Sequence, residues 1–177
     1  MSSHPKPRRT VTLTIRTEDK VLKALIHEAD DRKITVNTFV SQILADYVDW
    51  GRHAEKYGSV EIAHDGLAQL FDLLDDDTLA KYGKDTAQKR WKSLISIWHG
   101  QMTPEEVLKF VVFWLEKTKQ AKIAFSKNEM PRRIVAFHKL GRKGSIVFKN
   151  AIETMFELAN KKVVVDARDD QLSFIVE

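Results

Sequence analysis

The sequence predicts an α+β protein with two parts: an N-terminal strand-helix-helix module, and a separate C-terminal domain with the element order β-α-α-α-β-β-α-β-β. Three observations support this fold class. Residues 10–16, TVTLTIR, alternate apolar and polar side chains as a strand does. Residues 19–50 carry two stretches of helical periodicity, and residues 161–177 are typical of a β-hairpin. The predicted boundaries are a basic arm at 1–9, the module at 10–51, a linker at 52–59 and the C-terminal domain at 60–177.

The predicted N-terminal strand has no partner strand nearby in the sequence. One face carries the apolar side chains Val11, Leu13 and Ile15. The other carries Thr12, Thr14 and Arg16. Backbone N–H and C=O groups need hydrogen-bond partners, so the strand is expected to pair with its copy in a second chain.

Two amphipathic helices are expected after this strand. The first opens at Thr17-Glu18-Asp19 and the second at Thr35, and Gly51 is expected to end the second. So short a segment rarely buries a core by itself, and the chain has no cysteine for a disulfide. Association of two copies is the remaining solution. The predicted dimer core consists of Val11, Leu13, Ile15, Leu22, Phe39, Val40, Ile43, Leu44 and Tyr47.

In this order, TVTLTIR, EDKVLKALIHEADDR and ITVNTFVSQILADYVDW resemble the ribbon-helix-helix family of transcription factors, relatives of the Arc and methionine repressors. The similarity covers residues 8–50 and is greatest to archaeal-type versions, although Ser41 stands where Asn is common. The resemblance implies that a paired ribbon enters the DNA major groove. By position, the implied base contacts are Thr12, Thr14 and Arg16. The implied phosphate contacts are Arg8, Arg9, Thr35, Val36 through its N–H, and Asn37.

Physical chemistry agrees with these roles. The major groove admits a two-stranded ribbon, and an arginine can bond the O6 and N7 atoms of guanine together. A helix N-terminus offers free N–H groups to a phosphate. The charges that precede Glu18 are all positive, which suits an arm beside DNA, although basic termini are often merely solvated.

The remaining residues predict a domain large enough to fold alone. A short strand is expected at 59–63, followed by helices at 64–76, 77–100 and 103–120. Strands at 121–127 and 132–140, a helix at 145–160 and the hairpin at 161–177 complete it. Thr103 and Pro104 form a strong helix start.

Catalytic and cofactor motifs are lacking. The sequence has no phosphate-binding glycine loop and no H-E-x-x-H motif, and its six histidines do not stand at metal-ligand spacing. We therefore expect neither an enzyme nor a bound cofactor or metal. The run Asp75 to Asp77 is better explained by a helix start than by magnesium. Trp91, Trp98 and Trp114 suit a core better than a ligand pocket.

One basic cluster is ambiguous. The segment MPRRIVAFHKLGRKGS surrounds His138 and holds five cations, Arg132, Arg133, Lys139, Arg142 and Lys143. It is open to three interpretations: an anion site, a second contact with the DNA backbone, or a solvated face.

The sequence therefore predicts a cytoplasmic, homodimeric regulator of transcription that binds double-stranded DNA and has no membrane segment. Pairing of dimers into tetramers on DNA is left open by the sequence, and the C-terminal domain is expected to sense a small-molecule effector or add subunit contacts. Two alternatives remain: an antitoxin that regulates its own gene, and a sequence-tolerant architectural DNA-binding protein.

Overall fold

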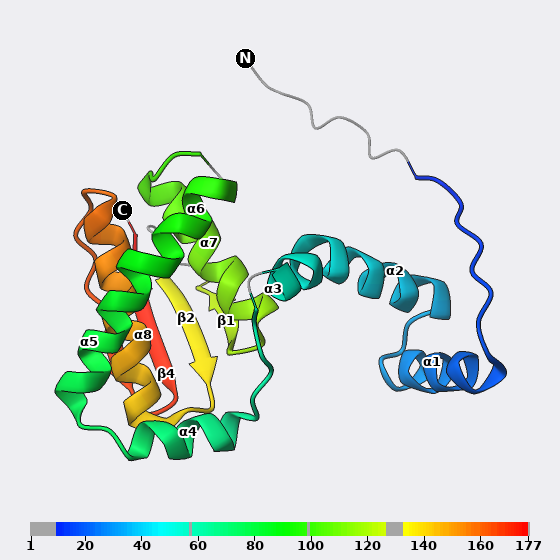
Figure 1. Ribbon diagram of the computed structural model, residues 1–177, viewed down its shortest axis with the longest axis horizontal. Coiled ribbons are helices and arrows are strands. Elements are labelled where there is room, and N and C mark those ends of the chain that lie inside the picture. The colour runs from blue at the N-terminus through cyan, green and yellow to red at the C-terminus, as the bar shows by residue number, and fades with distance from the viewer. Residues whose placement is uncertain (1–9, 57, 99, 127–132, 177) are drawn as a thin grey trace. The chain divides into compact units, whose positions relative to one another are not determined.

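The computed structural model describes residues 10–56, 58–98, 100–126 and 133–176 (Figure 1). The chain divides into two compact units, residues 1–58 (unit 1) and 59–177 (unit 2). The described residues are mostly helical, with one four-stranded antiparallel sheet near the C-terminus.

Unit 1 is helical where two helices are expected, but it lacks the predicted strand. Helix α1 spans Asp19–Asp31 and α2 spans Val36–Asp46. The helix does not end at Gly51, because a π-helical turn, η1 (Tyr47–Gly51), continues it into α3 (Arg52–Lys56). Thr35 caps α2 as predicted, its hydroxyl accepting the N–H of Thr38 at 3.1 Å. Helix α1 begins after Glu18 without a side-chain cap, so the expected capping hydroxyl is wrong.

The predicted fold class is therefore wrong. Residues 10–18 form no strand, and the regular structure of the described residues begins with the helix α1. Alternation alone does not make a strand, since a strand requires a hydrogen-bonded neighbour and this chain supplies none among its described residues. The strand expected at 59–63 is also absent: these residues have no regular structure, and Val60 and Ile62 are exposed.

In its described residues, unit 2 has four α-helices and one π-helical turn before the sheet. Its helices and strands are α4 (His64–Asp72), α5 (Asp76–Thr86), a second π-helical turn η2 (Ala87–Trp91), α6 (Lys92–Trp98), α7 (Pro104–Lys117), β1 (Ala121–Phe125), β2 (Arg133–His138), α8 (Gly141–Leu158), β3 (Asp166–Arg168) and β4 (Gln171–Ile175). Two predicted helix starts are confirmed: Asp75 accepts the N–H of Thr78 at 2.8 Å, and Thr103 accepts that of Glu106 at 3.3 Å.

The sheet has the strand order β1-β2-β4-β3, with every pair antiparallel. One of its faces packs into the core, which includes Ile134, Ala136, Leu172 and Phe174. Helix α8 contacts both β3 and β4, and α7 contacts β1. Helices α5 and α8 approach so closely that a Cβ atom on Gly83 would lie 2.4 Å from the carbonyl oxygen of Val147.

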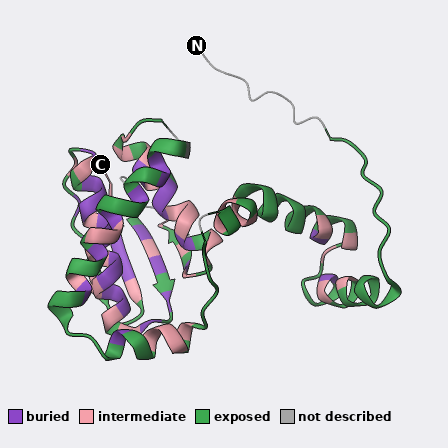
Figure 2. Cartoon of the chain, in the orientation of Figure 1, coloured by how far each residue is buried: buried purple, intermediate pink, exposed green. Residues whose placement is uncertain are grey.

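Burial differs sharply between the two units (Figure 2). Unit 2 has an extensive apolar core. In the described part of unit 1, the buried side chains are those of Ala29 and Phe39. The cation of Arg32 lies 4.7 Å from the centre of the Phe39 ring, which adds to the small set of contacts inside this unit.

Candidate nucleic-acid interface

The segment 10–16 is exposed and makes no backbone hydrogen bond to any described residue. The predicted base-contacting side chains Thr12, Thr14 and Arg16 are exposed and make no side-chain hydrogen bond or ion pair with a described residue. In an extended backbone, which the alternation of these residues predicts, alternate side chains point to opposite sides. The hydroxyls and the guanidinium thus share one side, and they are able to donate to base edges.

The start of α2 is a second candidate contact. The Thr35 hydroxyl accepts from Thr38, and the Thr35 carbonyl accepts from the N–H of Phe39 at 2.9 Å. The N–H groups of Val36 and Asn37 therefore have no partner among the described residues and lie at the positive end of the helix dipole. These two N–H groups are able to donate hydrogen bonds to a phosphate oxygen. The predicted phosphate contacts Arg8 and Arg9 lie outside the described residues.

The third feature of unit 1 is a set of large apolar side chains that the chain itself leaves uncovered. We call it the unit 1 apolar surface: Val11, Leu13, Ile15, Val21, Leu22, Ile26, Ile43, Leu44, Tyr47 and Val48. Their exposed fractions run from 39% for Val21 to 80% for Val11. Of the predicted dimer core, Phe39 is instead buried by its own chain and Val40 is half-buried.

The basic cluster before and within α8 is largely committed to contacts inside the chain. Arg142 donates two hydrogen bonds to Asp76, at 2.8 and 2.9 Å. The ammonium of Lys143 donates to the carbonyl oxygens of Asp72 and Leu74. Both cations thus fasten the start of α8 to the α4–α5 loop. Lys139 is exposed, Arg133 lies at the start of β2, and Arg132 is outside the described residues.

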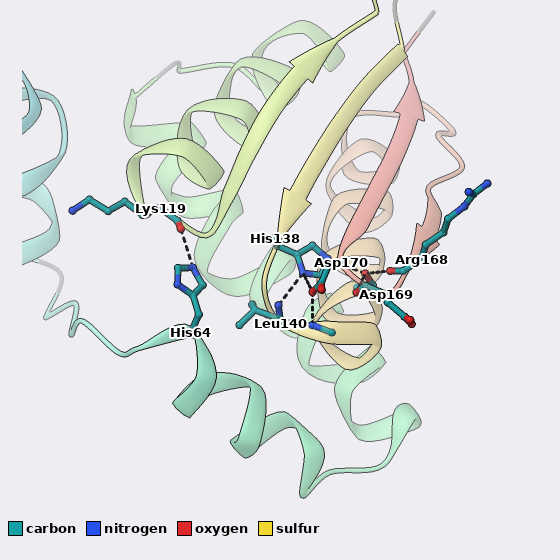
Figure 3. Close-up of polar contacts among 9 residues, drawn as sticks. His64, Lys119, His138, Leu140, Arg168, Asp169 and Asp170 are labelled. Carbon is teal, nitrogen blue, oxygen red and sulfur yellow. Dashed lines mark hydrogen bonds and ion pairs between the residues drawn. The ribbon is translucent and has the colours of Figure 1, made fainter. Parts of the chain in front are cut away.

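The loop of this cluster already holds a carboxylate of the chain. The N–H of Gly141 donates to the Asp170 carboxylate at 2.8 Å. The backbone N–H of His138 donates to the Asp170 carbonyl at 2.9 Å. The turn between β3 and β4 is thereby fixed against the loop that precedes α8 (Figure 3).

His138, Ser145 and Asp170 have the composition of a serine-hydrolase triad but the opposite hydrogen-bond direction. The N–H of Leu140 donates to Nδ1 of His138 at 3.2 Å (Figure 3), so Nε2 carries the proton and donates to the Ser145 hydroxyl at 2.8 Å. Ser145 in turn donates to the carbonyl oxygen of Arg168. A catalytic histidine must accept the proton of the serine. This buried network therefore joins β2, α8 and the β3–β4 turn without activating a nucleophile. Sequence spacing did not indicate it, because Asp170 comes from a distant hairpin.

Burial lowers the pKa of His138 below its ordinary value of 6.5; the Asp170 carboxylate acts in the opposite direction, and His64 lowers it further. The imidazole is therefore neutral at pH 7. The unfolded chain binds a proton here below about pH 6.5, whereas the folded chain resists it. The free energy of unfolding is expected to fall as the pH drops below 6.5, by at most about 1.4 kcal/mol per unit.

Chemical denaturation between pH 5 and 8 measures this slope. The His138→Gln variant keeps a neutral donor toward Ser145, and its unfolding free energy is expected to depend less on pH between 5 and 6.5. His27→Gln is the exposed control and should follow wild type. Equal slopes in wild type and His138→Gln would contradict the assignment. The carboxylates of Asp75 and Asp76 contribute little to the slope between pH 5 and 8. Hydrogen bonds from Thr78 lower the pKa of Asp75, and the hydrogen bonds from Arg142 lower the pKa of Asp76. The stability they add is lost only as the pH falls below 3.8.

A scan against protein-family models found no match, and neither did searches of curated proteins and of solved structures. Along the described residues, no helix combines the length and apolarity needed to cross a membrane. Within the same residues, no three His, Asp or Glu side chains gather as metal ligands do.

Proposed function

We propose that this chain is a cytoplasmic, homodimeric, DNA-binding regulator of transcription, whose unit 1 both joins the two copies and contacts the duplex. The observation that carries the proposal is the unit 1 apolar surface. A segment of this size with two buried side chains has too small a core of its own, and it leaves ten large apolar side chains uncovered. A second copy supplies matching apolar side chains.

In the proposed complex segment 10–16 of each copy contacts the duplex. Val11, Leu13 and Ile15 turn toward the helices, which leaves the opposite side chains for the major groove. The free N–H groups of Val36 and Asn37 bind a phosphate on either side. Two-fold symmetry of the dimer then requires an operator with two inverted half-sites.

Unit 2 distinguishes this proposal from an antitoxin. The C-terminal segment of an antitoxin is typically short and orders on its toxin. Here residues 59–177 hold an extensive core within the chain itself. A folded body of this kind suits a regulator that receives a second signal or adds subunit contacts.

The test is binding to duplex DNA from upstream of the gene, followed by fluorescence anisotropy across a salt series. Arg16→Ala is expected to weaken binding to the preferred duplex by about 1–3 kcal/mol and to remove its preference over an unrelated duplex. Arg90→Ala is the matched control, since it removes an exposed arginine from unit 2 and should leave both affinities unchanged.

Two results would count against the proposal. If wild type and Arg16→Ala bind every duplex equally, with a steep salt dependence, the protein is a sequence-tolerant architectural DNA-binding protein. If neither binds any duplex, unit 1 serves association alone.

A further inference from the structure

A row of four side chains crosses the whole sheet of unit 2 on the face opposite its core. The register pairs Lys122 of β1 with Phe137 of β2, Phe137 with Gln171 of β4, and Gln171 with Arg168 of β3. Directly opposed residues of antiparallel strands point to the same face, with Cβ atoms about 5 Å apart. A cation, an aromatic ring, an amide and a second cation therefore stand next to one another; we call them the sheet-face row.

Burial shows that this face is open. Along β2, the side chains of Ile134, Ala136 and His138 are buried in the core, whereas those between them are exposed or half-buried. Phe137 leaves 48% of its surface exposed. The outward residues of the other strands are likewise exposed or half-buried apart from Ser173, a small residue of the central strand β4. The sheet-face row is thus accessible to a partner.

The side chains of the sheet-face row suit a ligand that has both a negative charge and a flat ring. Lys122 makes no ion pair with a described residue, and Gln171 makes no side-chain hydrogen bond with one. The guanidinium of Arg168 lies 3.6 Å from Asp166, yet its side chain remains 74% exposed. The row itself contains no carboxylate. Phe137 offers a ring for stacking, Gln171 offers an amide that both donates and accepts, and the two cations stand at opposite ends.

The shape of the face favours a polymer over a small molecule. Sites for small molecules are concave and surround most of the ligand, whereas the face of a sheet touches its ligand from one side only. A nucleic-acid strand compensates by making several such contacts in succession. A duplex is a poorer fit, because its bases are stacked on one another and cannot lie on Phe137.

We propose that the sheet-face row binds single-stranded DNA: one base stacks on Phe137, Gln171 bonds to the edge of that base, and Lys122 and Arg168 bind the phosphates on either side. The choice of DNA over RNA rests on the proposed function, which brings the chain to DNA. The site itself rests on the register and exposure of the sheet and does not depend on unit 1.

The experiment measures binding of the full chain to a fluorescent oligothymidylate of about 12 nucleotides, a length within the range that such sites cover. Phe137→Ala is expected to weaken binding about tenfold, because the stacking of one base on an aromatic ring strengthens binding by about that factor. Phe125→Ala is the matched control. Phe125 is 47% exposed on β1, but it pairs with Ile134 and so belongs to the opposite face of the sheet. Its replacement should leave the affinity unchanged.

Further variants separate this site from unit 1. Lys122→Ala and Arg168→Ala are expected to weaken binding to the oligothymidylate and to reduce its salt dependence. Arg16→Ala should leave it unchanged while it abolishes the duplex preference. Conversely, Phe137→Ala should leave duplex binding intact. The two proposals can therefore fail independently.

Three outcomes would overturn the inference. Equal losses for Phe137→Ala and Phe125→Ala would mean that the ring does not stack on a base. Equal or tighter binding of oligouridylate would overturn the choice of DNA. A change in oligomeric mass of Phe137→Ala, measured by sedimentation without nucleic acid, would assign the face to contact between copies of the chain.

Discussion

Leu44→Glu is expected to separate the proposed dimer into single chains. Leu44 lies on α2 within the unit 1 apolar surface and is 42% exposed in the single chain. In the dimer that exposed part is covered, so a carboxylate there must lose its hydration without gaining a partner. Burial of an unpaired charge costs several kcal/mol, and two-fold symmetry repeats the cost in the second copy. We expect the dissociation constant of the dimer to rise by at least about 10³-fold.

Sedimentation equilibrium measures this change directly, because it distinguishes a single chain of 20.4 kDa from a dimer of twice that mass. Leu44→Glu should sediment as the single chain over the concentration range in which wild type sediments as a pair. Its affinity for the upstream duplex should fall as well, since the two half-sites are then bound in separate events. Its circular dichroism should keep the helical signal of unit 2, which has its own core, and lose part of that of unit 1, whose core is too small to stand alone.

Leu70→Glu is the matched control for this experiment. Leu70 lies on α4 of unit 2 and is 51% exposed, so the same substitution places the same charge on a helix surface outside unit 1. It should remain a pair and keep its DNA affinity. A wild-type chain that sediments singly, or a Leu44→Glu chain that stays paired, would remove the main support for the proposed function.

The N-terminal segment illustrates what a sequence pattern cannot decide. The alternation of residues 10–16 indicates an extended backbone with two different sides. Whether such a backbone is a strand depends on a hydrogen-bonded neighbour. The described chain offers none, so the segment has no regular structure. The pattern therefore gave the wrong secondary structure, and its division of the side chains into two sets stays a prediction.

The helix boundaries were predictable where a cap is present and failed where the helical geometry changes. Thr35, Asp75 and Thr103 each accept a backbone N–H in the first turn, as their positions indicate. The two π-helical turns were missed, although the sequence contains a signal for them. Apolar or small residues recur every four positions through η2, at Leu79, Gly83, Ala87, Trp91 and Ile95, and all five are buried.

This spacing explains the π-helical turn. Four residues of an α-helix advance about 40° beyond one full turn, so four such steps move a stripe about 160° around the axis. A π-helical turn has more residues per turn and absorbs part of that rotation. Phe39, Ile43, Tyr47 and Gly51 repeat the same spacing through η1. Runs of exact four-residue spacing are therefore the signal that sequence reasoning overlooked.

The sheet-face row and the His138 network depend on contacts that are distant in the sequence. The two-residue turn Asp169-Asp170 predicts that Arg168 pairs with Gln171 across β3 and β4. The pairing of Lys122 with Phe137, and of Phe137 with Gln171, follows only from the registers between β1, β2 and β4. A shift of one residue in β2 would turn Phe137 into the core. Residue types alone could not place these side chains together.

The largest effect on stability is expected from Trp91→Ala. Trp91 ends η2 with 1% of its surface exposed, 4.6 Å from the ring centre of Trp114 and 5.7 Å from that of Phe110. Removing the indole leaves a cavity between two rings that stand on another helix, α7, which limits collapse of the site. We expect the free energy of unfolding of unit 2 to fall by about 3–5 kcal/mol, measured by urea denaturation followed by circular dichroism.

Trp91→Phe distinguishes the loss of packing from the loss of the indole N–H. The Nε1 atom of Trp91 is buried and makes no hydrogen bond within the described structure. An unpaired buried donor costs about 1–3 kcal/mol, and phenylalanine removes that cost while it keeps an aromatic ring against Phe110 and Trp114. The smaller ring still leaves some empty volume, so the two effects oppose each other. Trp91→Phe is therefore expected to lose less than half as much stability as Trp91→Ala. If the two variants are equally unstable, the N–H must have a partner in solution, and the tryptophan is held by a hydrogen bond as well as by packing.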